Sequence, residues 1–177
     1  MADLPKLPAG YELIAVSTIG STNDELKQRA VSDNANEGLV VWSLEQTAGK
    51  GRQKRSWVSE PGNMYCSVLF RPDCVMSEAA QIGFLPVIAA GESLAGLLGN
   101  SAPLRYKWPN DLLLNKKKIG GMLLESGVGQ NAMASWVVIG CGLNLQHFPT
   151  DTRFPATSVN HELGETLAIE AVVEAYL

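Results

Sequence analysis

The chain has 177 residues, 46% of them hydrophobic, and a formal net charge of −4 at pH 7. This length and apolar content fit one folded domain and exclude a disordered chain. The acidic balance disfavours non-specific nucleic-acid binding, which needs a basic surface. The 3 cysteines and 2 histidines show no zinc-ligand spacing. We therefore expect small buried cysteines in a protein of the reducing cytoplasm.

One apolar stretch, residues 79–98, has nearly the length of a membrane span. Gln81, Pro86 and Glu92 interrupt it. The pattern therefore predicts a buried helix with a kink, and no membrane association. Residues 1–10 show no charged-then-apolar pattern typical of a signal peptide.

The remaining hydrophobic pattern predicts strands connected by short turns. Ser21 is expected to cap a helix that runs to about Val31, because a serine side chain can accept a hydrogen bond from a free amide of the first turn. A long helical region is expected from Ser77 to Leu98, and a last helical pattern begins near Glu165. Most strands follow one another in hairpin order, which indicates an α+β fold with a mixed sheet and the helices to one side. The predicted strands are residues 11–16, 39–44, 64–70, 104–108, 112–114, 119–124 and 136–145.

A glycine-containing cationic loop follows the second strand, with the sequence EQTAGKGRQKRSW at 45–57. Gly49 and Gly51 allow the backbone to approach a ligand closely, so the loop could bind phosphate or carboxylate oxygens. The phosphate-binding P-loop motif is excluded, since it needs glycine where Leu44 stands and serine or threonine where Gly51 stands. A solvated hairpin loop remains the alternative. The loop carries four cations, Lys50, Arg52, Lys54 and Arg55.

A second motif, KWPND at 107–111, combines a lysine, a turn and a carboxylate. Pro109 predicts an extended Trp108 and the end of a strand. Lys107 would then reach into a cleft from the strand end, or form an ordinary surface ion pair.

Three further short segments could contribute to a site. STN at 21–23 is a helix cap, and a helix N-terminus also presents free N–H groups to a ligand. The glycine pairs at 120–121 and 140–142 predict either space for a ligand or tight packing. Asn144 could contact a nucleobase or hold a turn. No Gly-x-Ser-x-Gly elbow or Cys–His pairing supports nucleophilic catalysis.

Together these segments resemble the catalytic domain of biotin protein ligases. The matching sequences are STN at 21–23, EQTAGKGR at 45–52, KWPND at 107–111, KIGGMLLE at 118–125 and GCGLNL at 140–145. The resemblance implies a mixed sheet flanked by helices, related to class II aminoacyl-tRNA synthetases and lipoate ligases. It also implies a reaction in two steps, in which biotin and ATP form biotinyl-5′-AMP and biotin then passes to a lysine of a carboxylase biotin carrier domain.

The resemblance assigns roles to individual residues. Lys107, Arg52 and Asp111 would serve catalysis, with Asp111 orienting the acceptor lysine or receiving its proton. Trp57 would belong to the core or to the wall of the nucleotide pocket. Mg²⁺ is expected with ATP. Biotin would contact Ser21, Thr22, Asn23, Gln46, Lys50, Gly51, Arg52 and Lys107, and ATP would contact Arg52, Arg55, Lys107, Lys118 and Asn144.

Two residues depart from the family pattern. Lys50 stands where arginine is usual, and Lys54 where glycine is usual. Lysine lacks the two-pronged guanidinium, so we expect slower adenylation or leakier retention of the adenylate, which restoring arginine at position 50 would test. Lys54 would stiffen the loop if the usual glycine supplies a positive φ.

The expected organisation is one catalytic domain over residues 1–177, without a helix-turn-helix domain or the small C-terminal β-barrel of many family members. A homodimer is possible. Two alternatives stay open, namely a lipoate or octanoate ligase of the same fold and a module that binds biotin or an adenylate without turnover. A purely structural domain is the third and least favoured interpretation.

Overall fold

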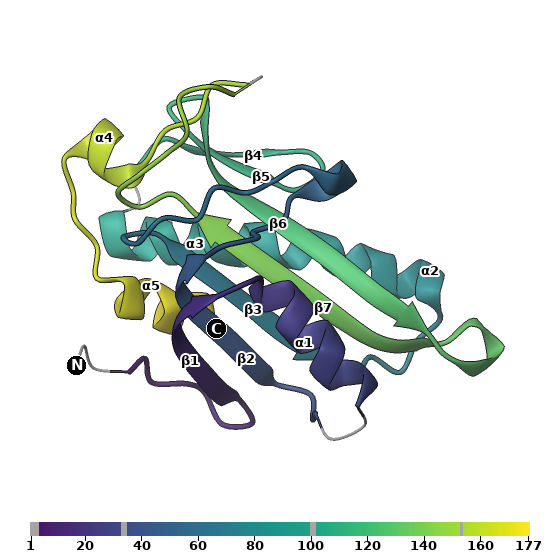
Figure 1. The fold of residues 1–177 in the computed structure, drawn as a ribbon. Helices are drawn as coiled ribbons and strands as arrows, with labels where there is room; N and C mark the ends of the chain where they lie inside the picture. Colours follow the sequence, from purple (N-terminus) through teal and green to yellow (C-terminus); the bar gives the residue numbers. More distant parts are fainter. Residues whose placement is uncertain (1–3, 33–34, 100–101, 153) are drawn as a thin grey trace.

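A seven-stranded sheet runs through the protein, and helices cover both of its faces (Figure 1). The computed structural model describes residues 4–32, 35–99, 102–152 and 154–177. The order of strands across the sheet is β1-β2-β3-β7-β6-β5-β4. The strands are β1 (Glu12–Ile19), β2 (Leu39–Gln46), β3 (Met64–Phe70), β4 (Leu104–Lys107), β5 (Asp111–Leu114), β6 (Lys117–Val128) and β7 (Ala134–Leu143). The α-helices are α1 (Thr22–Val31), α2 (Met76–Ala79), α3 (Leu85–Leu98), α4 (Val159–Leu163) and α5 (Ile169–Tyr176).

The sheet is mixed, as the sequence predicted. β1 and β2 are parallel because α1 carries the chain back between them, and the other neighbours pair antiparallel. The α+β class with a mixed sheet is therefore confirmed.

The helices lie on two faces of the sheet, so the expectation that they lie to one side is wrong. Leu26 of α1 packs in a cluster with Val41 of β2. The preceding residue of β2, Val40, belongs to a separate cluster with Leu94 of α3 and Val173 of α5. Successive strand residues point to opposite faces, so α1 covers one face while α3 and α5 cover the other.

The predicted helical region from Ser77 to Leu98 is divided into three pieces. α2 is followed by a 3₁₀ segment, Ala80–Phe84, and then by α3. Pro86 stands in the first turn of α3, where its missing N–H costs no hydrogen bond. The stretch Met76–Leu98 has the length and apolarity of a membrane span. Ala90 and Leu94 are fully buried against the sheet, and about 33% of the apolar window is buried.

Two tight turns join β6 to its neighbouring strands. Asn115 and Lys116, with φ of 50° and 66°, turn the chain between β5 and β6 as predicted. Asn131 and Ala132, with φ of 52° and 59°, make an unpredicted turn, so that β6 is longer than expected. Helix α4 was not predicted, and α5 begins at Ile169, later than Glu165.

Candidate active site

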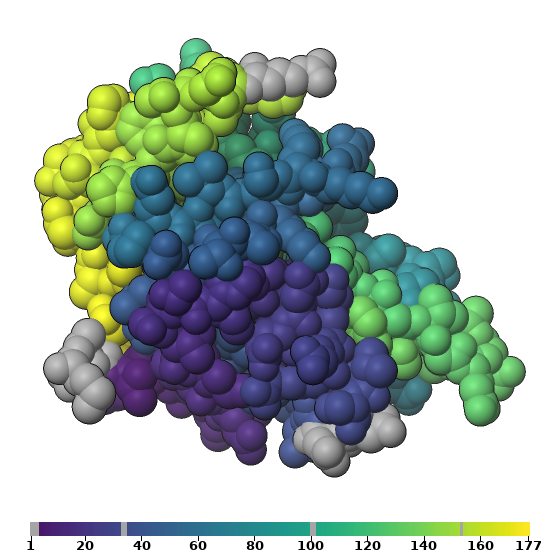
Figure 2. Space-filling view, viewed as in Figure 1, coloured from purple at the N-terminus to yellow at the C-terminus, as the bar shows by residue number. Residues whose placement is uncertain are grey.

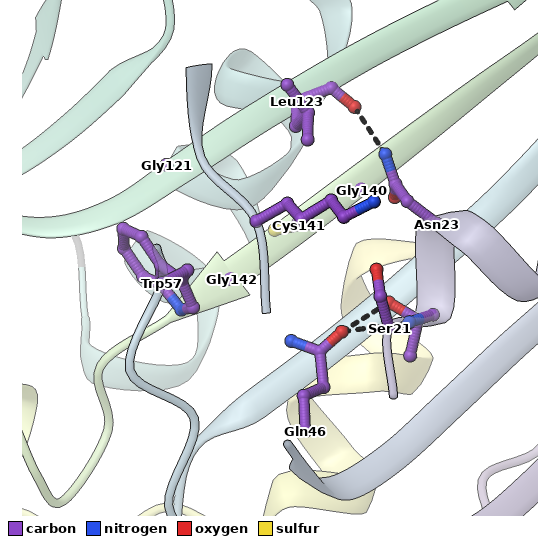
Figure 3. A pocket seen from close by; sticks show the side chains of 11 residues that line it. Ser21, Asn23, Gln46, Trp57, Gly121, Leu123, Gly140, Cys141 and Gly142 are labelled. Carbon is purple, nitrogen blue, oxygen red and sulfur yellow. Dashed lines mark hydrogen bonds between the residues drawn. The ribbon is translucent and has the colours of Figure 1, made fainter. Parts of the chain in front are cut away.

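A small cavity of about 30 Å³ lies at the N-terminus of α1. α1 enters from one side, the end of β2 and its loop from another, and β6 and β7 supply the floor (Figure 3). The cavity is lined by Ser21, Thr22, Asn23, Gln46, Lys50, Trp57, Gly121, Leu123, Gly140, Cys141 and Gly142.

The first turn of α1 fixes the polar rim of the cavity. Ser21 is the predicted cap, and its Oγ accepts a 3.4 Å hydrogen bond from the Asp24 amide. As an acceptor there, the Ser21 hydroxyl keeps its own hydrogen for donation. The Thr22 amide donates to Oε1 of Gln46 at 2.9 Å, and Nε2 of Gln46 donates to Ser59 at 3.0 Å. These bonds hold the end of β2 against the helix.

Asn23 is 4% exposed, and contacts within the protein satisfy its donors. Its Oδ1 accepts a 2.6 Å hydrogen bond from Ser67. Its Nδ2 donates to the Leu123 carbonyl at 3.3 Å and to Glu125 Oε2 at 2.9 Å. An amide nitrogen has two hydrogens, so the side chain of Asn23 offers a ligand only an acceptor.

Glycines form the floor because no side chain would fit there. A Cβ on Gly140 would stand 2.2 Å from Oδ1 of Asn23, and one on Gly142 would stand 2.6 Å from Nε1 of Trp57. That indole Nε1 is buried and has no hydrogen-bond partner in the described part of the chain. A buried donor without a partner is costly, and the side chain that carries this one lines the cavity.

The cationic loop is a small hairpin at the rim. Lys50 bridges to Ser56, and Gln53 and Lys54 at its tip have φ of 56° and 60°. A Cβ on Gly49 would meet the Trp57 carbonyl at 2.4 Å. The backbone of this loop is therefore a hairpin, as the alternative interpretation predicted. The same hairpin carries cations beside the cavity.

Lys50 spans from the loop to α1. Its Nζ lies 2.5 Å from Oδ2 of Asp24, whose Oδ1 lies 2.7 Å from Lys27. Burial raises the pKa of Asp24, but the Lys27 and Lys50 ammonium groups outweigh burial and hold it below its ordinary value.

The other loop cations lie outside the cavity. Nη1 of Arg52 donates to Oδ1 of Asn110 at 3.2 Å, which links the loop to the KWPND turn. Nε of Arg55 donates to the Arg52 carbonyl at 3.1 Å, within the loop itself.

In the KWPND segment the lysine and the carboxylate have different partners. Nζ of Lys107 lies 4.0 Å from the centre of the Phe154 ring. Asp111 accepts from Lys118 at 2.6 Å, and Lys118 lies 5.2 Å from the Trp57 ring. The Trp108–Pro109 peptide bond is cis. Lys118 and Asp111 therefore stand beside Trp57, while Lys107 packs on an aromatic ring.

Asn144 holds a turn in this structure. It is 2% exposed, and its Nδ2 donates to the Thr157 carbonyl at 3.1 Å. Its backbone amide donates to the Ile119 carbonyl at 2.7 Å. Its expected contact with the nucleotide stays a prediction.

The structure gathers part of the predicted site around one cavity. Ser21, Thr22, Asn23, Gln46 and Lys50 line it. The ligand contacts assigned to all predicted residues remain predictions. Seven residues lie outside the cavity lining, namely Gly51, Arg52, Arg55, Lys107, Asp111, Lys118 and Asn144.

Trp57 was expected in the core or in a pocket wall, and the paired glycines beside a ligand or in tight packing; Trp57, Gly121, Gly140 and Gly142 line the cavity. Ser67 and Glu125, which hold Asn23, were missing from the predicted site, because their contacts with it span 44 and 102 residues and no local pattern indicates them.

Residues 15–144 match the sequence model of the Biotin/lipoate A/B protein ligase family. The chain belongs to this family. It is 34% identical over 173 residues to "Bifunctional ligase/repressor BirA" of Bacillus spizizenii, covering 95% of this chain and 52% of that protein. It is 37% identical over 140 residues to the biotin–[acetyl-CoA-carboxylase] ligase of Paracoccus denitrificans, covering 76% of this chain and 58% of that protein.

Solved structures of the family have the same fold. The Aquifex aeolicus biotin protein ligase in complex with biotin and ATP has a TM-score of 0.77 at 25% identity, over 93% of this chain and 66% of that one. The Leishmania major biotin protein ligase in complex with biotinyl-5-AMP has a TM-score of 0.77 at 26% identity, over 93% of this chain and 71% of that one. The chain spans about half the length of the curated relatives it matches. The fold related to biotin protein ligases, predicted from five short motifs, is thus confirmed.

Proposed function

We propose that this chain supplies ATP-dependent biotin protein ligase activity. It would join biotin to ATP as biotinyl-5′-AMP, release pyrophosphate, and transfer biotin to a lysine of a carboxylase biotin carrier domain. The observation that carries the proposal is the small polar cavity at the N-terminus of α1, with unused hydrogen-bonding groups on its walls.

The polar groups around the cavity complement the ureido ring of biotin, but the cavity of about 30 Å³ must widen to admit that ring. That ring has one carbonyl acceptor and two N–H donors. The hydroxyl of Ser21 keeps a hydrogen to donate, the indole N–H of Trp57 has no partner, and Oδ1 of Asn23 retains accepting capacity. Complementary donors and acceptors of this kind would hold a neutral polar ring in a fixed orientation.

The same polarity disfavours lipoate and octanoate. The dithiolane ring of lipoate and the alkyl end of octanoate offer no comparable hydrogen bonds. Burying Ser21 and Trp57 against them would leave polar groups unpaired, which costs about 1–3 kcal/mol per group. Biotin is therefore the substrate that this cavity supports best.

Adenylation needs charge neutralisation more than a protein nucleophile. The biotin carboxylate attacks the α-phosphate of ATP, so two anions must approach each other. Arg52 and Lys107 would screen this repulsion and orient the groups. The contact of Lys107 with the Phe154 ring leaves the ammonium hydrogens on its other side able to donate.

Mg²⁺ would accompany ATP. Within the described residues there is no group of three or more histidine, cysteine, aspartate or glutamate side chains that could hold a metal ion. Asp111 is engaged by Lys118. The phosphate oxygens and water would therefore supply most of the ligands, as is usual for nucleotide-bound Mg²⁺.

In the transfer step, the amine of the acceptor lysine would attack the acyl carbonyl and release AMP. Asp111 would orient this amine or receive its proton, after exchanging its Lys118 partner. The biotin carrier domain is the expected protein partner, the cytoplasm the expected compartment, and a homodimer an open possibility.

The test is biotin-dependent exchange between ATP and labelled pyrophosphate, with lipoate and octanoate each supplied in place of biotin as controls. We expect exchange with biotin alone, and at least a hundredfold loss in Lys107→Met, because removing one preorganised charge costs about 10²–10³ in rate. Lys116→Met, at the exposed β5–β6 turn, is the matched control and should keep wild-type exchange. Exchange with lipoate or octanoate would overturn the substrate assignment. Biotin binding without exchange would identify a binding module.

A further inference from the structure

Asp24 occupies an unusual place in the first turn of α1. Ser21 already caps the helix, so the Asp24 carboxylate is free for other contacts. Its two oxygens contact two lysines, Lys27 at 2.7 Å and Lys50 at 2.5 Å. Lys27 in turn lies 2.7 Å from Glu125, the carboxylate that accepts from Asn23. A continuous set of contacts thus connects the cationic loop with a residue of the cavity wall.

The cationic loop has few attachments beyond its own hairpin. The amide of Gly51 donates to the Arg55 carbonyl, and that of Trp57 to the Gly49 carbonyl, so these bonds hold the hairpin only to itself. Three side chains reach outside it: Lys50 contacts α1, Arg52 contacts Asn110, and Trp57 packs on Gly142 beside Lys118. The position of the loop over the cavity therefore depends on side-chain contacts.

We infer that Asp24 is a positioning residue that anchors the loop 49–57 over the cavity through Lys50 and thereby prolongs retention of the ligand. The anchoring is a property of the ligand-free protein, and only the retention rests on the proposed function. Lys50 lines the cavity while its ammonium is held by Asp24. Opening this ion pair would release one of the contacts that hold the loop over the cavity, and a bound ligand would then leave faster.

The expected size of the effect is modest. The side chains of Lys50 and Asp24 are 46% and 41% exposed, so solvent screens their attraction. Lys27 already fixes the Asp24 carboxylate, so forming the pair restricts mainly the lysine. Exposed pairs of this kind correspond to changes of about two- to fivefold in an equilibrium or rate.

The first experiment is trypsin cleavage of the ligand-free full chain, followed by mass spectrometry of cuts after Arg52 and Arg55. Asp24→Asn and Lys50→Met should each accelerate these cuts about two- to fivefold, and the double variant should equal either single variant. Glu25→Gln is the matched control. It removes the same charge from the same turn of α1, where Glu25 pairs with Arg29 at 2.7 Å, and should leave cleavage unchanged.

Two further measurements distinguish a loss of loop anchoring from a general loss of folding. Lys50→Arg keeps the charge and should restore slow cleavage. Raising the salt concentration should accelerate cleavage of the wild type but not of Asp24→Asn, because salt screens an exposed ion pair. Wild-type cleavage rates in Asp24→Asn, or additive effects in the double variant, would overturn the anchoring.

Retention is then measured by chasing labelled biotin from each variant. Asp24→Asn should release biotin about two- to fivefold faster than Glu25→Gln. Equal release rates from the two variants would overturn the retention step. A wild type that binds no biotin would instead overturn the proposed function, while the cleavage result would still decide whether Asp24 anchors the loop.

Discussion

Lys54 stands in the left-handed region of the backbone, with φ of 60°, at the tip of the cationic hairpin. This finding fits the expectation that the position needs a positive φ, which glycine adopts without strain. The consequence for the activity of the loop remains a prediction.

Lys54→Gly should raise the free energy of unfolding by about 0.5–1 kcal/mol, because it removes left-handed strain from a side chain. Chemical denaturation measures this change. Arg55→Gly, at φ of −73°, is the control and should be neutral or slightly destabilising. A destabilised Lys54→Gly variant would contradict the strain at this position.

Gly140 makes the sharpest residue-scale prediction. In Gly140→Ala the new Cβ would stand 2.2 Å from Oδ1 of the buried Asn23. We expect a loss of about 1–3 kcal/mol in unfolding free energy and at least tenfold weaker biotin binding, because Asn23 must move. Gly96→Ala, with nothing within 4 Å, is the control and should gain up to about 1 kcal/mol from helix propensity. Normal biotin affinity in Gly140→Ala would show that Asn23 does not shape the ligand site.

At the scale of elements, the sequence predicted whether a segment is a helix or a strand better than it predicted the length of that segment. The cap at Ser21 and the strand before the cationic loop are where the local pattern indicated. Only part of β6 was predicted, and α4 was not predicted at all, because the ends of both elements depend on contacts with residues distant in sequence. α4, for example, is fixed by a polar cluster around Glu162.

Glu162 gives the element-scale prediction. Hydrogen bonds from Lys117, Asn115 and Thr157 lower its pKa from 4.5 to about 2. Since the folded-state pKa is depressed, the stabilisation is complete above the ordinary pKa and is lost as pH falls toward 2.

Glu162→Gln should therefore lower the free energy of unfolding at pH 7 by about 1.5–3 kcal/mol, the range for hydrogen bonds to a charged group. The difference from wild type should shrink between pH 4.5 and 2, which denaturation at several pH values measures. The exposed Glu165→Gln is the control and should stay near wild type. A difference that does not depend on pH would contradict the role of the charge.

At the scale of the whole molecule, the sheet has a distinct apolar cluster on each face. Leu26 belongs to the cluster under α1, while Leu94 belongs to the larger cluster that α3 and α5 cover. The cavity lies at the N-terminus of α1, and Cys141 connects it with the larger cluster on the opposite face.

Leu94→Ala should lower the free energy of unfolding by about 2–5 kcal/mol, because it opens a cavity in a fully buried position. Leu97→Ala, in the same helix but 38% exposed, is the matched control and should cost less than about 1 kcal/mol. Thermal and chemical denaturation measure both. Equal losses of unfolding free energy in the two variants would contradict the conclusion that the Leu94 face of α3 packs in the core.

The sequence by itself determined the family and the mixed α+β class. Short contiguous motifs, such as KWPND and the G-x-G-R loop, specify local chemistry that needs no long-range information. Alternation of side chains likewise indicated most strands.

Only the tertiary structure decided which of these motifs share a cavity and how their polar atoms are engaged. Asn23 meets Gly140 and Glu125 because α1 packs across β6 and β7, and Lys50 meets Asp24 because the hairpin folds back over α1. Contacts between residues so far apart depend on strand order and register. Strand order and register are fixed by the packing of the apolar clusters on both faces of the sheet, and no local pattern records them.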